Sequence, residues 1–363
     1  MAQRILHCMA GAATGGAETY CVDALLALQN VGMKQMLLTR PHTQRLDALR
    51  AAGVEIRTAP FGNLFRGATR RALAKAIHEF KPDIVQYWMG RAASYAIPGT
   101  HQVNGPRLLP DELSGNAEAH PFKNIGWFGG YYDLKRYPHM DAYVGVTHDI
   151  ARHIREAGIA PDKVFTIHTI ADLPAAAPVP RTTFDTPEHA PLLLALARLH
   201  PKKGLDILLR ALADLPGAYL WIAGDGPLKH ELPRLAAQLG VADRVRFLGW
   251  RNDRAALLAA CDICVFPSRY EPFGTVMIEA WAAGKPLIAA AAAGPAAYVK
   301  NEENGLLVPV DDVEALNYAI ARVMSDIELN QRLIDGGHKS YEALFTPAVM
   351  VAAYQELYQS LAE

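Results

Sequence analysis

Two glutamates, Glu271 and Glu279, lie in the stretch RYEPFGTVMIEAWAAGKPLI at 269–288, at a spacing that suits two ends of one ligand. A strand-like run ends just before them, and the sequence predicts a helix that begins near Thr275. Glu279 would then lie one turn into that helix, ~6 Å along its axis. Backbone N–H groups of residues 274–276 would face outward at the positive end of the helix dipole, so a phosphate would fit between the two carboxylates.

A ligand made of a sugar, a diphosphate and a ribose matches this arrangement. Glu271 would reach the sugar hydroxyls, and Glu279 would accept hydrogen bonds from the two ribose hydroxyls. The other interpretation is structural, with Glu271 as a residue of a Glu-Pro turn and Glu279 as a partly exposed helix acid. The residues by themselves leave both interpretations open.

A cationic pair, Arg198 and Lys203, follows another buried run in ARLHPKKGLDIL at 197–208. A guanidinium supplies a fork of donors and an ammonium supplies a point charge, so the two suit a diphosphate at a strand end. A solvated basic loop is the alternative. Farther along, FLGWRND at 247–253 places a loop where a nucleobase could pack, although nothing in it specifies a base.

Glycines mark two more junctions between a predicted strand and a predicted helix. Gly15 and Gly16 stand in GAATGGAE at 11–18, and Gly224 and Gly226 stand in AGDGP at 223–227. Without side chains, such residues let backbone N–H groups approach an anion. The first loop lacks the G-x-G-x-x-G order of a dinucleotide site, and a plain glycine turn explains it equally well.

Strands alternate with helices along the whole chain, which predicts doubly wound parallel α/β architecture. The predicted strands are 4–9, 34–40, 54–60, 83–88, 106–112, 142–148, 163–169, 191–198, 218–223, 244–249, 263–267 and 286–291. The predicted helices are 15–32, 44–52, 67–80, 149–157, 204–214, 228–239, 253–260, 275–283 and most of the chain from 311 onward. Residues 120–140, rich in aromatics, are expected to be irregular.

A proline-rich stretch interrupts this rhythm and predicts two domains. We expect a Rossmann-like domain at 1–172, a linker at 173–190, a second Rossmann-like domain at 191–345, and a C-terminal helix at 346–363 that packs back on the first domain. Ligands of such sheets bind at the carboxyl ends of the strands, so the site is expected in a cleft between the two domains.

Composition excludes several classes of protein. The 363 residues carry a net charge of −1, which points to no nucleic-acid partner. Residues 1–170 carry +5 and the remainder −6, an asymmetry that would suit an anionic surface facing the first half. No signal peptide or membrane span is evident. Cys261 and Cys264 form a lone CxxC without a histidine pair, so we expect core thiols of a reduced cytoplasmic protein rather than a zinc site.

SRYEPFGTVMIEAWAAGKPLI resembles the E-x-F-G…E-A…G-x-P signature of the retaining, GT-B-fold glycosyltransferases of family 4, also called group 1. The flanking segments follow the family order. They are GGAE (15–18), ARLHPKKGLD (197–206), AGDGP (223–227), RVRFLGW (244–250), ACDICVFPS (260–268) and NGLLVPVDD (304–312). This resemblance covers essentially all of 190–325 and is looser over the first 170 residues.

The resemblance implies a role for each donor-side residue. Arg198 and Lys203 would bind the donor diphosphate, with Gly16 approaching it from the other domain. Glu271 would contact the sugar, beside the backbone of Phe273, Gly274 and Thr275, and Glu279 would hold the ribose. The family transfers sugar with retention and without a bound metal or cofactor, because cations and a helix dipole meet the leaving-group charge. The mechanism is usually described as front-face, with the donor phosphate taking the acceptor proton.

The first half departs from the family pattern. Many relatives carry a His-Gly pair near the transferred sugar, whereas residues 106–116 read PRLLPDELSGN, with Asp111, Glu112 and nearby His120 as substitutes. The segment HTIAD (168–172) stands where relatives read Asn-Gly-x-Asp. GWFGGYYDLKRY (126–137) resembles a segment of a bacterial branch of the family. Its Tyr131, Tyr132 and Lys135 would face the acceptor or, alternatively, pack within the domain.

The helix RGATRRALAKAIHEFK (66–81) is basic and amphipathic, which fits peripheral contact with an anionic membrane or simply a helix that covers the sheet. We therefore expect a lipopolysaccharide or lipid-linked cell-envelope glycan as acceptor, on the inner face of the cytoplasmic membrane. A soluble-acceptor transferase of the sucrose or glycogen-synthase type is an alternative. A GT-B protein that binds a nucleotide sugar without turnover is another.

Overall fold

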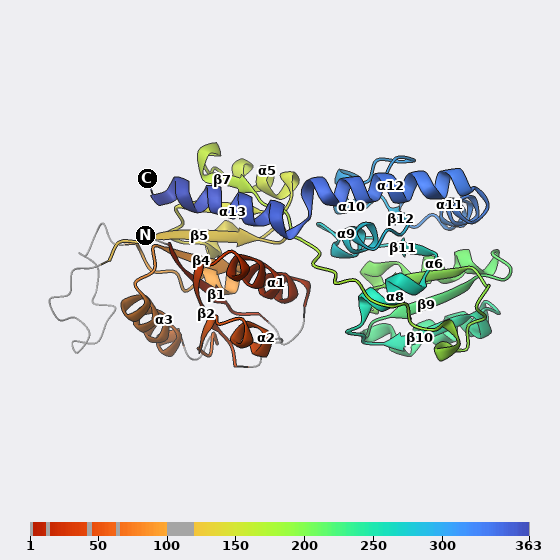
Figure 1. Ribbon diagram of the computed structural model, residues 1–363, viewed down its shortest axis with the longest axis horizontal. Helices are drawn as coiled ribbons and strands as arrows, with labels where there is room; N and C mark the ends of the chain where they lie inside the picture. Colours follow the sequence, from red (N-terminus) through yellow and green to blue (C-terminus); the bar gives the residue numbers. More distant parts are fainter. Residues whose placement is uncertain (1–2, 12–14, 42–45, 63–65, 100–119, 363) are drawn as a thin grey trace. The chain divides into compact units, whose positions relative to one another are not determined.

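The computed structural model describes residues 3–11, 15–41, 46–62, 66–99 and 120–362. The chain forms two compact units (Figure 1). The first unit contains Met1–Ile170 and Pro347–Glu363, and the second contains Ala171–Thr346. Each unit is built around its own parallel sheet.

The first unit is a doubly wound sheet in the order β3-β2-β1-β4-β5-β6-β7, with all paired strands parallel. Its strands are β1 (Arg4–Met9), β2 (Lys34–Thr39), β3 (Glu55–Thr58), β4 (Ile84–Trp88), β5 (Lys123–Phe128), β6 (Ala142–Gly145) and β7 (Val164–Thr166). Its helices are α1 (Gly16–Asn30), α2 (Leu46–Ala51), α3 (Arg66–Phe80), α4 (Met89–Ala93), α5 (His148–Glu156) and α13 (Pro347–Ala362).

The expectation that 120–140 is irregular is wrong at its centre, because residues 123–128 form β5. This strand pairs with β4 on one side and β6 on the other, and its inner residues are fully buried. The aromatic side chains that obscured the strand pattern fill the core, where Trp127 lies 5.4 Å from Trp88 and 5.6 Å from Tyr20 between ring centroids. The predicted strand 106–112 lies outside the described residues.

Helix α13 completes the first unit from the far end of the chain, and it lies beside α1 (Figure 1). Two buried tyrosines fasten it. Tyr358 Oη donates to Gln86 Oε1 at 2.6 Å, and Gln86 Nε2 donates to Tyr354 Oη at 3.3 Å. Gln3 Nε2 also donates to the backbone oxygen of Tyr358. The sheet core of this unit is therefore closed by a helix from outside 1–170.

The second unit is a sheet in the order β10-β9-β8-β11-β12-β13, again with parallel pairs. Its strands are β8 (Leu192–Leu196), β9 (Tyr219–Ala223), β10 (Val245–Gly249), β11 (Ile263–Phe266), β12 (Leu287–Ala290) and β13 (Leu306–Val308). Its helices are α6 (Leu205–Ala213), α7 (Glu231–Gln238), α8 (Arg254–Ala260), α9 (Thr275–Ala282), α10 (Ala293–Tyr298), α11 (Val313–Ser325) and α12 (Ile327–Leu344).

The short apolar runs of β8 and β11 form the centre of this sheet because both faces are covered, which suits continuous Leu, Ile and Val. Side-chain caps fix where the long helices begin. The carboxylate of Asp312 accepts from Ala315 N at 2.8 Å, and that of Asp326 accepts from Leu329 N at 2.9 Å. The predicted helical end of the chain is confirmed as α11, α12 and α13.

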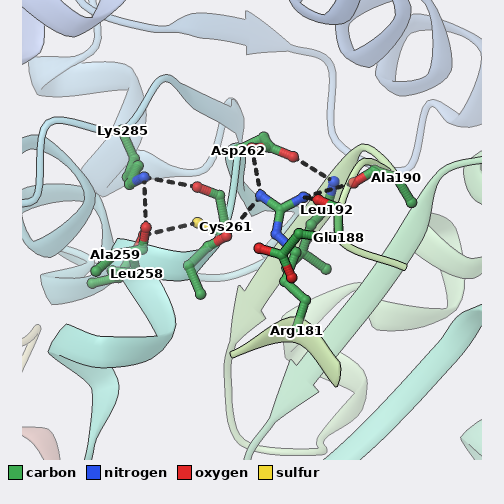
Figure 2. Close-up of polar contacts among 10 residues, drawn as sticks. Arg181, Glu188, Ala190, Leu192, Leu258, Ala259, Cys261, Asp262 and Lys285 are labelled. Carbon is green, nitrogen blue, oxygen red and sulfur yellow. Dashed lines mark hydrogen bonds and ion pairs between the residues drawn. The ribbon is translucent and has the colours of Figure 1, made fainter. Parts of the chain in front are cut away.

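The proline-rich residues 171–190 belong to the second unit, where Arg181 fastens them to the amino end of β8 (Figure 2). Its guanidinium donates to the backbone oxygens of Ala190 at 2.7 Å and Ala260 at 2.9 Å and to Asp262 Oδ1 at 2.7 Å. Asp262 Oδ2 accepts in turn from Leu192 N at 2.8 Å. This clamp lies at the edge of the sheet opposite the carboxyl ends of the strands.

All four cysteines are free and buried, so the expectation of core thiols is confirmed. Burial raises the pKa of the Cys261 thiol to about 12, and it raises that of Cys264 as well, which keeps both protonated. Among the described helices, none has the length and apolar character needed to cross a bilayer.

Candidate active site

The carboxyl ends of β8, β9 and β11 bring most of the predicted donor-side residues to one edge of the second sheet. Arg198 follows β8, and it is exposed. The loop after β9 runs so close to 197–199 that a Cβ at Gly224 would collide with Ala197 O, and one at Gly226 with the backbone of Leu199. Leu199 N donates to Asp225 O at 3.0 Å. The two glycines therefore position the loop that carries Arg198.

Lys203 and Glu271 form an ion pair across two loops that are 68 residues apart in sequence. Their side chains are only 24% and 15% exposed, so water screens the pair weakly. Gly204 makes this approach possible, because its φ of +62° suits glycine and a Cβ there would collide with Pro267 O at the end of β11. The ion pair lies just before the start of α9.

Backbone hydrogen bonds hold the loop that carries Glu271 on both sides. Arg269 N donates to Lys202 O at 2.8 Å, and Gly294 N donates to Glu271 O at 2.7 Å. A Cβ at Gly294 would collide with Phe273 O, so the start of α10 also packs tightly on this loop. The carboxylate of Glu271 is therefore presented by a backbone that has little freedom.

Arg269, which sequence reasoning missed, ties the same loop to two other parts of the unit. Its guanidinium forms a two-pronged pair with Asp206, with both nitrogen–oxygen distances 2.7 Å, and its Nε donates to Asp311 Oδ1 at 2.5 Å. Burial favours a higher pKa for Asp206, but the hydrogen bonds and charge of Arg269 outweigh it and leave the pKa lowered. No local sequence pattern pairs residues 42 and 63 positions apart.

Helix α9 begins at Thr275, as predicted, with Gly274 as its N-cap in the left-handed region at φ +99°. A Cβ at Gly274 would collide with the Phe266 ring, so this glycine is needed for close packing as well as for its backbone conformation. Phe273 is buried and stacks its ring edge-on against Tyr298 at 5.7 Å. Phe273 would therefore meet a ligand only through its backbone.

Glu279 is buried rather than partly exposed, with 4% of its surface accessible. Arg254, the first residue of α8, places Nη1 2.9 Å from Glu279 Oε1. A buried carboxylate needs such a partner, because an unpaired charge inside a protein costs several kcal/mol, about 3–5 when one partner of a pair is removed. Arg254 was not identified from the sequence, because its contact with Glu279 joins two helices that no local sequence pattern pairs.

Beyond Gly249, the loop predicted to meet a base presents Trp250, which is 56% exposed. Its indole Nε1 donates to Asn252 Oδ1 at 3.2 Å. Arg251 pairs with Asp253, and its guanidinium lies 5.4 Å from the centre of the Phe184 ring. An exposed indole at the carboxyl edge of the sheet offers a flat face on which a base could stack.

In the first unit, Gly15 and Gly16 lie at the start of α1, and the carboxylate of Glu18 lies beside Gly11 and Gly15. A Cβ at Gly11 or at Gly15 would collide with Glu18, which is 8% exposed. A Cβ at Gly16 meets nothing within 4 Å. Gly15 thus makes room for an acid of its own helix, and Gly16 leaves open space. Glu18 is a second residue that the sequence did not single out.

The acceptor-side residues do not gather in one place. Tyr131 is 37% exposed and donates its hydroxyl to Asp149 at the start of α5, and the Tyr132 ring lies 6.0 Å from that of Phe128. Lys135 is exposed on the same loop after β5. His120 lies at the opposite edge of the sheet, with Nε2 3.4 Å from Oδ1 of Asp83, the residue before β4.

Asp111 and Glu112 lie outside the described residues. Among the described residues, no three histidine, cysteine, aspartate or glutamate side chains form a group that could hold a metal ion.

Comparison with known proteins connects these two sheets to one family. The model of glycosyl transferases group 1 matches residues 181–340, and the model of glycosyltransferase family 4 matches residues 14–173. The chain is 32% identical to the lipopolysaccharide core biosynthesis glycosyltransferase LpsD of Rhizobium meliloti, over 98% of both chains. It is 33% identical to LpsE of the same organism, over 95% of this chain and 96% of LpsE.

The fold is shared with solved glycosyltransferases. The crystal structure of Anabaena HepE in complex with UDP and glucose superposes with a TM-score of 0.80, at 20% identity, over 99% of this chain and 100% of that one. A sucrose-phosphate synthase of Thermosynechococcus elongatus superposes with a TM-score of 0.77 at 22% identity, over 99% of each chain. The chain therefore belongs to the group 1, family 4 glycosyltransferases and has their GT-B fold of two Rossmann-like domains.

Proposed function

We propose that this glycosyltransferase moves a sugar, with retention, from a nucleotide-diphosphate sugar to a lipopolysaccharide core or lipid-linked cell-envelope glycan. The Lys203–Glu271 ion pair at the start of α9 is the observation that carries the proposal. It combines a cation suited to a diphosphate with a carboxylate suited to sugar hydroxyls, next to outward-facing helix N–H groups. The R. meliloti relatives named for lipopolysaccharide core biosynthesis support the choice of acceptor.

In this proposal, the donor diphosphate competes with Glu271 for Lys203. Binding would release the Glu271 carboxylate toward the sugar, while Arg198 and the α9 N-terminus meet the charge that develops on the departing nucleotide. Glu279, held by Arg254, would accept from the ribose hydroxyls, because a carboxylate has lone pairs for several donors. The donor phosphate itself would take the acceptor proton.

A donor screen tests the proposal. UDP, GDP, ADP and their sugars are added to the protein, and its thermal unfolding is followed. A ligand at 100 times its Kd should add ~2.7 kcal/mol to the free energy of unfolding. Lys203→Ala should abolish the shift, whereas Lys202→Ala, which alters an exposed neighbouring cation, should retain it. Equal loss in both variants would contradict the assignment of the diphosphate to Lys203.

Turnover separates the alternatives. Release of free nucleotide with a lipopolysaccharide acceptor supports the proposal, and release only with a soluble sugar supports a transferase of the sucrose type. Nucleotide-sugar binding without turnover on any acceptor supports a silent binding protein. We expect EDTA to leave the turnover unchanged, because cationic side chains and a helix dipole stand in for a metal. A loss that Mg²⁺ restores would contradict that part of the proposal.

Peripheral membrane contact belongs to the same proposal and rests on α3. Leu73, Ala76 and Phe80 of this helix are buried against the first unit, so they are not available to enter a bilayer. Arg70 and Arg71 are exposed, so attachment on the cytoplasmic side would be electrostatic. Pelleting with anionic vesicles at low salt, reduced by Arg70→Glu with Arg71→Glu, is the expected result. No pelleting of the unchanged protein would refute it.

A further inference from the structure

A group of arginines at the carboxyl edge of the first sheet is not used by the donor-side site. Arg40 directly follows β2, Arg91 lies in α4 after β4, and Arg66 begins α3. The carboxyl ends of parallel strands share one edge of a sheet, and the order β3-β2-β1-β4 places these positions around β1. Ligands of such sheets bind at this edge, where the direction of winding reverses.

Backbone carbonyls hold the guanidinium of Arg40 in a fixed position. Nη2 donates to Phe61 O at 2.7 Å, Nε to Pro60 O at 3.3 Å, and Nη1 to Gly11 O at 3.4 Å. These three acceptors come from the ends of β3 and β1. They are backbone carbonyls, so they fix the direction in which the guanidinium fork points.

Tyr95 places Arg66 beside the residues that hold Arg40. Its hydroxyl donates to Gly62 O at 3.1 Å, and its ring stands edge-on to Phe61 at 5.6 Å. The guanidinium of Arg66 lies over the ring of Tyr95, with Cζ 5.4 Å from the centre of that ring. Arg66 is thus held beside the loop that also fixes Arg40.

Arg40 and Arg91 follow β2 and β4, the two strands that flank β1 in the sheet. The pKa of Arg40 is lowered, first by burial and second by the positive charge of Arg91, while Tyr95 acts in the opposite direction. An anion between two guanidiniums would relieve their mutual repulsion. Arg40 is half-buried and Arg91 is exposed, so an anion from solvent can reach the pair.

We propose that Arg40, Arg91 and Arg66 form a binding site for an anionic group, a phosphate or a carboxylate, on the acceptor saccharide. This proposal rests on the proposed function, because only a sugar transferase has an acceptor saccharide. It adds to that function that the acceptor carries a negative charge. Guanidiniums bind both kinds of anion through paired N–H groups, with phosphate carrying more charge at neutral pH. The fixed fork of Arg40 would orient the anion, and Arg91 would close on it from the solvent side.

The test compares charged and uncharged sugars by calorimetric titration at low salt. Glucose 6-phosphate and glucuronate are the anionic probes, and glucose is the neutral one. We expect the anionic probes to bind at least about tenfold more tightly than glucose, because one charge-assisted hydrogen bond contributes about that difference in affinity. Glucose 6-phosphate ahead of glucuronate assigns a phosphate, and the reverse order assigns a carboxylate. Equal binding of all three sugars overturns the proposal.

Variants locate the binding. Arg91→Gln, at an exposed position, should fold normally and lose about tenfold in affinity for the anionic sugar. Arg50→Gln is the matched control, because Arg50 is an exposed cation of the same unit that pairs locally with Asp47. Arg40→Lys keeps a charge but loses the fork, so it should weaken binding even where Arg40→Gln fails to fold. Unchanged affinity in Arg91→Gln overturns the proposal.

Two further results distinguish a site for an anionic acceptor from a membrane-binding surface and from the donor site. If Arg91→Gln reduces pelleting with anionic vesicles but leaves sugar-phosphate binding unchanged, the arginines serve a membrane surface and the proposal fails. Nucleotide binding is measured in the same samples, because its charged candidate residues lie in the second unit. Sugar-phosphate binding without any donor-induced thermal shift would contradict the proposed function but would still support the anion-binding site.

Discussion

At the scale of single residues, Glu271 and Glu279 differ in their partners, and this difference predicts different functions. Glu271 pairs with a cation proposed to bind phosphate, whereas Glu279 is buried and pairs with Arg254. Glu279→Ala should therefore raise the Kd of free nucleotide about tenfold, the value of one hydrogen bond to a charged group. Glu271→Ala should not raise that Kd, because it removes the carboxylate that competes with the diphosphate for Lys203, and it should lower turnover by about 100-fold. Titration with free nucleotide and an assay of nucleotide release measure the two effects.

The control for this pair is Glu303→Ala, which removes an exposed carboxylate of the same unit that pairs with exposed Lys300. It should change neither nucleotide affinity nor turnover. Equal losses of nucleotide affinity in Glu271→Ala and Glu279→Ala would show that the two carboxylates do not hold different parts of one donor.

His7, a buried residue of β1, predicts a dependence of stability on pH. Its Nδ1 accepts from Trp88 Nε1 at 3.3 Å, its Nε2 lies 3.1 Å from Gln35 Oε1, and burial lowers its pKa from 6.5 to about 3. Above pH 6.5, the ring is neutral in both folded and unfolded chains. As pH falls from 6.5 to about 3, only the unfolded chain takes the proton, so folding loses about 1.4 kcal/mol per pH unit.

Urea unfolding at a series of pH values checks this. His7→Gln should remove this contribution to the slope, and His189→Gln, at an exposed position, should retain it. A slope that is the same in all three proteins would show that His7 does not titrate as its burial requires.

At the scale of elements, Arg269 holds together the loops that carry the donor-side groups. It bridges Asp206 of α6, Asp311 and the Pro201 carbonyl. Arg269→Ala should cost about 1–2 kcal/mol, because the three side chains are only partly shielded from water. Lys229→Ala removes an exposed pair with Asp225 and should cost less than about 0.5 kcal/mol. Chemical unfolding measures both.

The stabilisation that the Arg269–Asp206 pair provides should also decrease as the pH falls. The pKa of Asp206 is lowered in the folded protein, so its contribution is present above the pKa of the unfolded chain and is lost as pH falls through the lowered value. The difference between the unchanged protein and Arg269→Ala should therefore shrink in acid. A constant difference down to low pH would mean that Asp206 is not the partner that matters.

The elements were predictable where apolar runs and capping residues specify them locally. β8, β11 and the start of α9 at Thr275 are confirmed, and so is the parallel α/β architecture of both sheets. β5 was missed because its aromatic residues disguise a strand that is buried on both faces. Arg254, Arg269 and Glu18 were missed for another reason: their roles depend on approaches between loops or helices that no local pattern encodes.

At the scale of the whole molecule, the chain leaves the first unit, forms the second and returns through α13. The two units have separate cores. The charged residues proposed to bind the donor lie in the second unit, whereas Tyr358 holds α13 in the first. Tyr358→Phe deletes the hydroxyl that donates to buried Gln86, and it leaves that acceptor unsatisfied. It should therefore destabilise the first unit by about 1–3 kcal/mol. Tyr318→Phe, which alters a tyrosine that is 66% exposed, is the control.

Calorimetry with and without nucleotide shows whether the two cores respond separately. We expect Tyr358→Phe to lower the melting temperature of one transition and a bound nucleotide to raise that of another, because each acts on a different core. Tyr318→Phe should move neither transition. A single transition that shifts with both perturbations would mean that the units unfold as one cooperative body. Donor binding would then stabilise α13 as well, and stability would be shared along the whole chain.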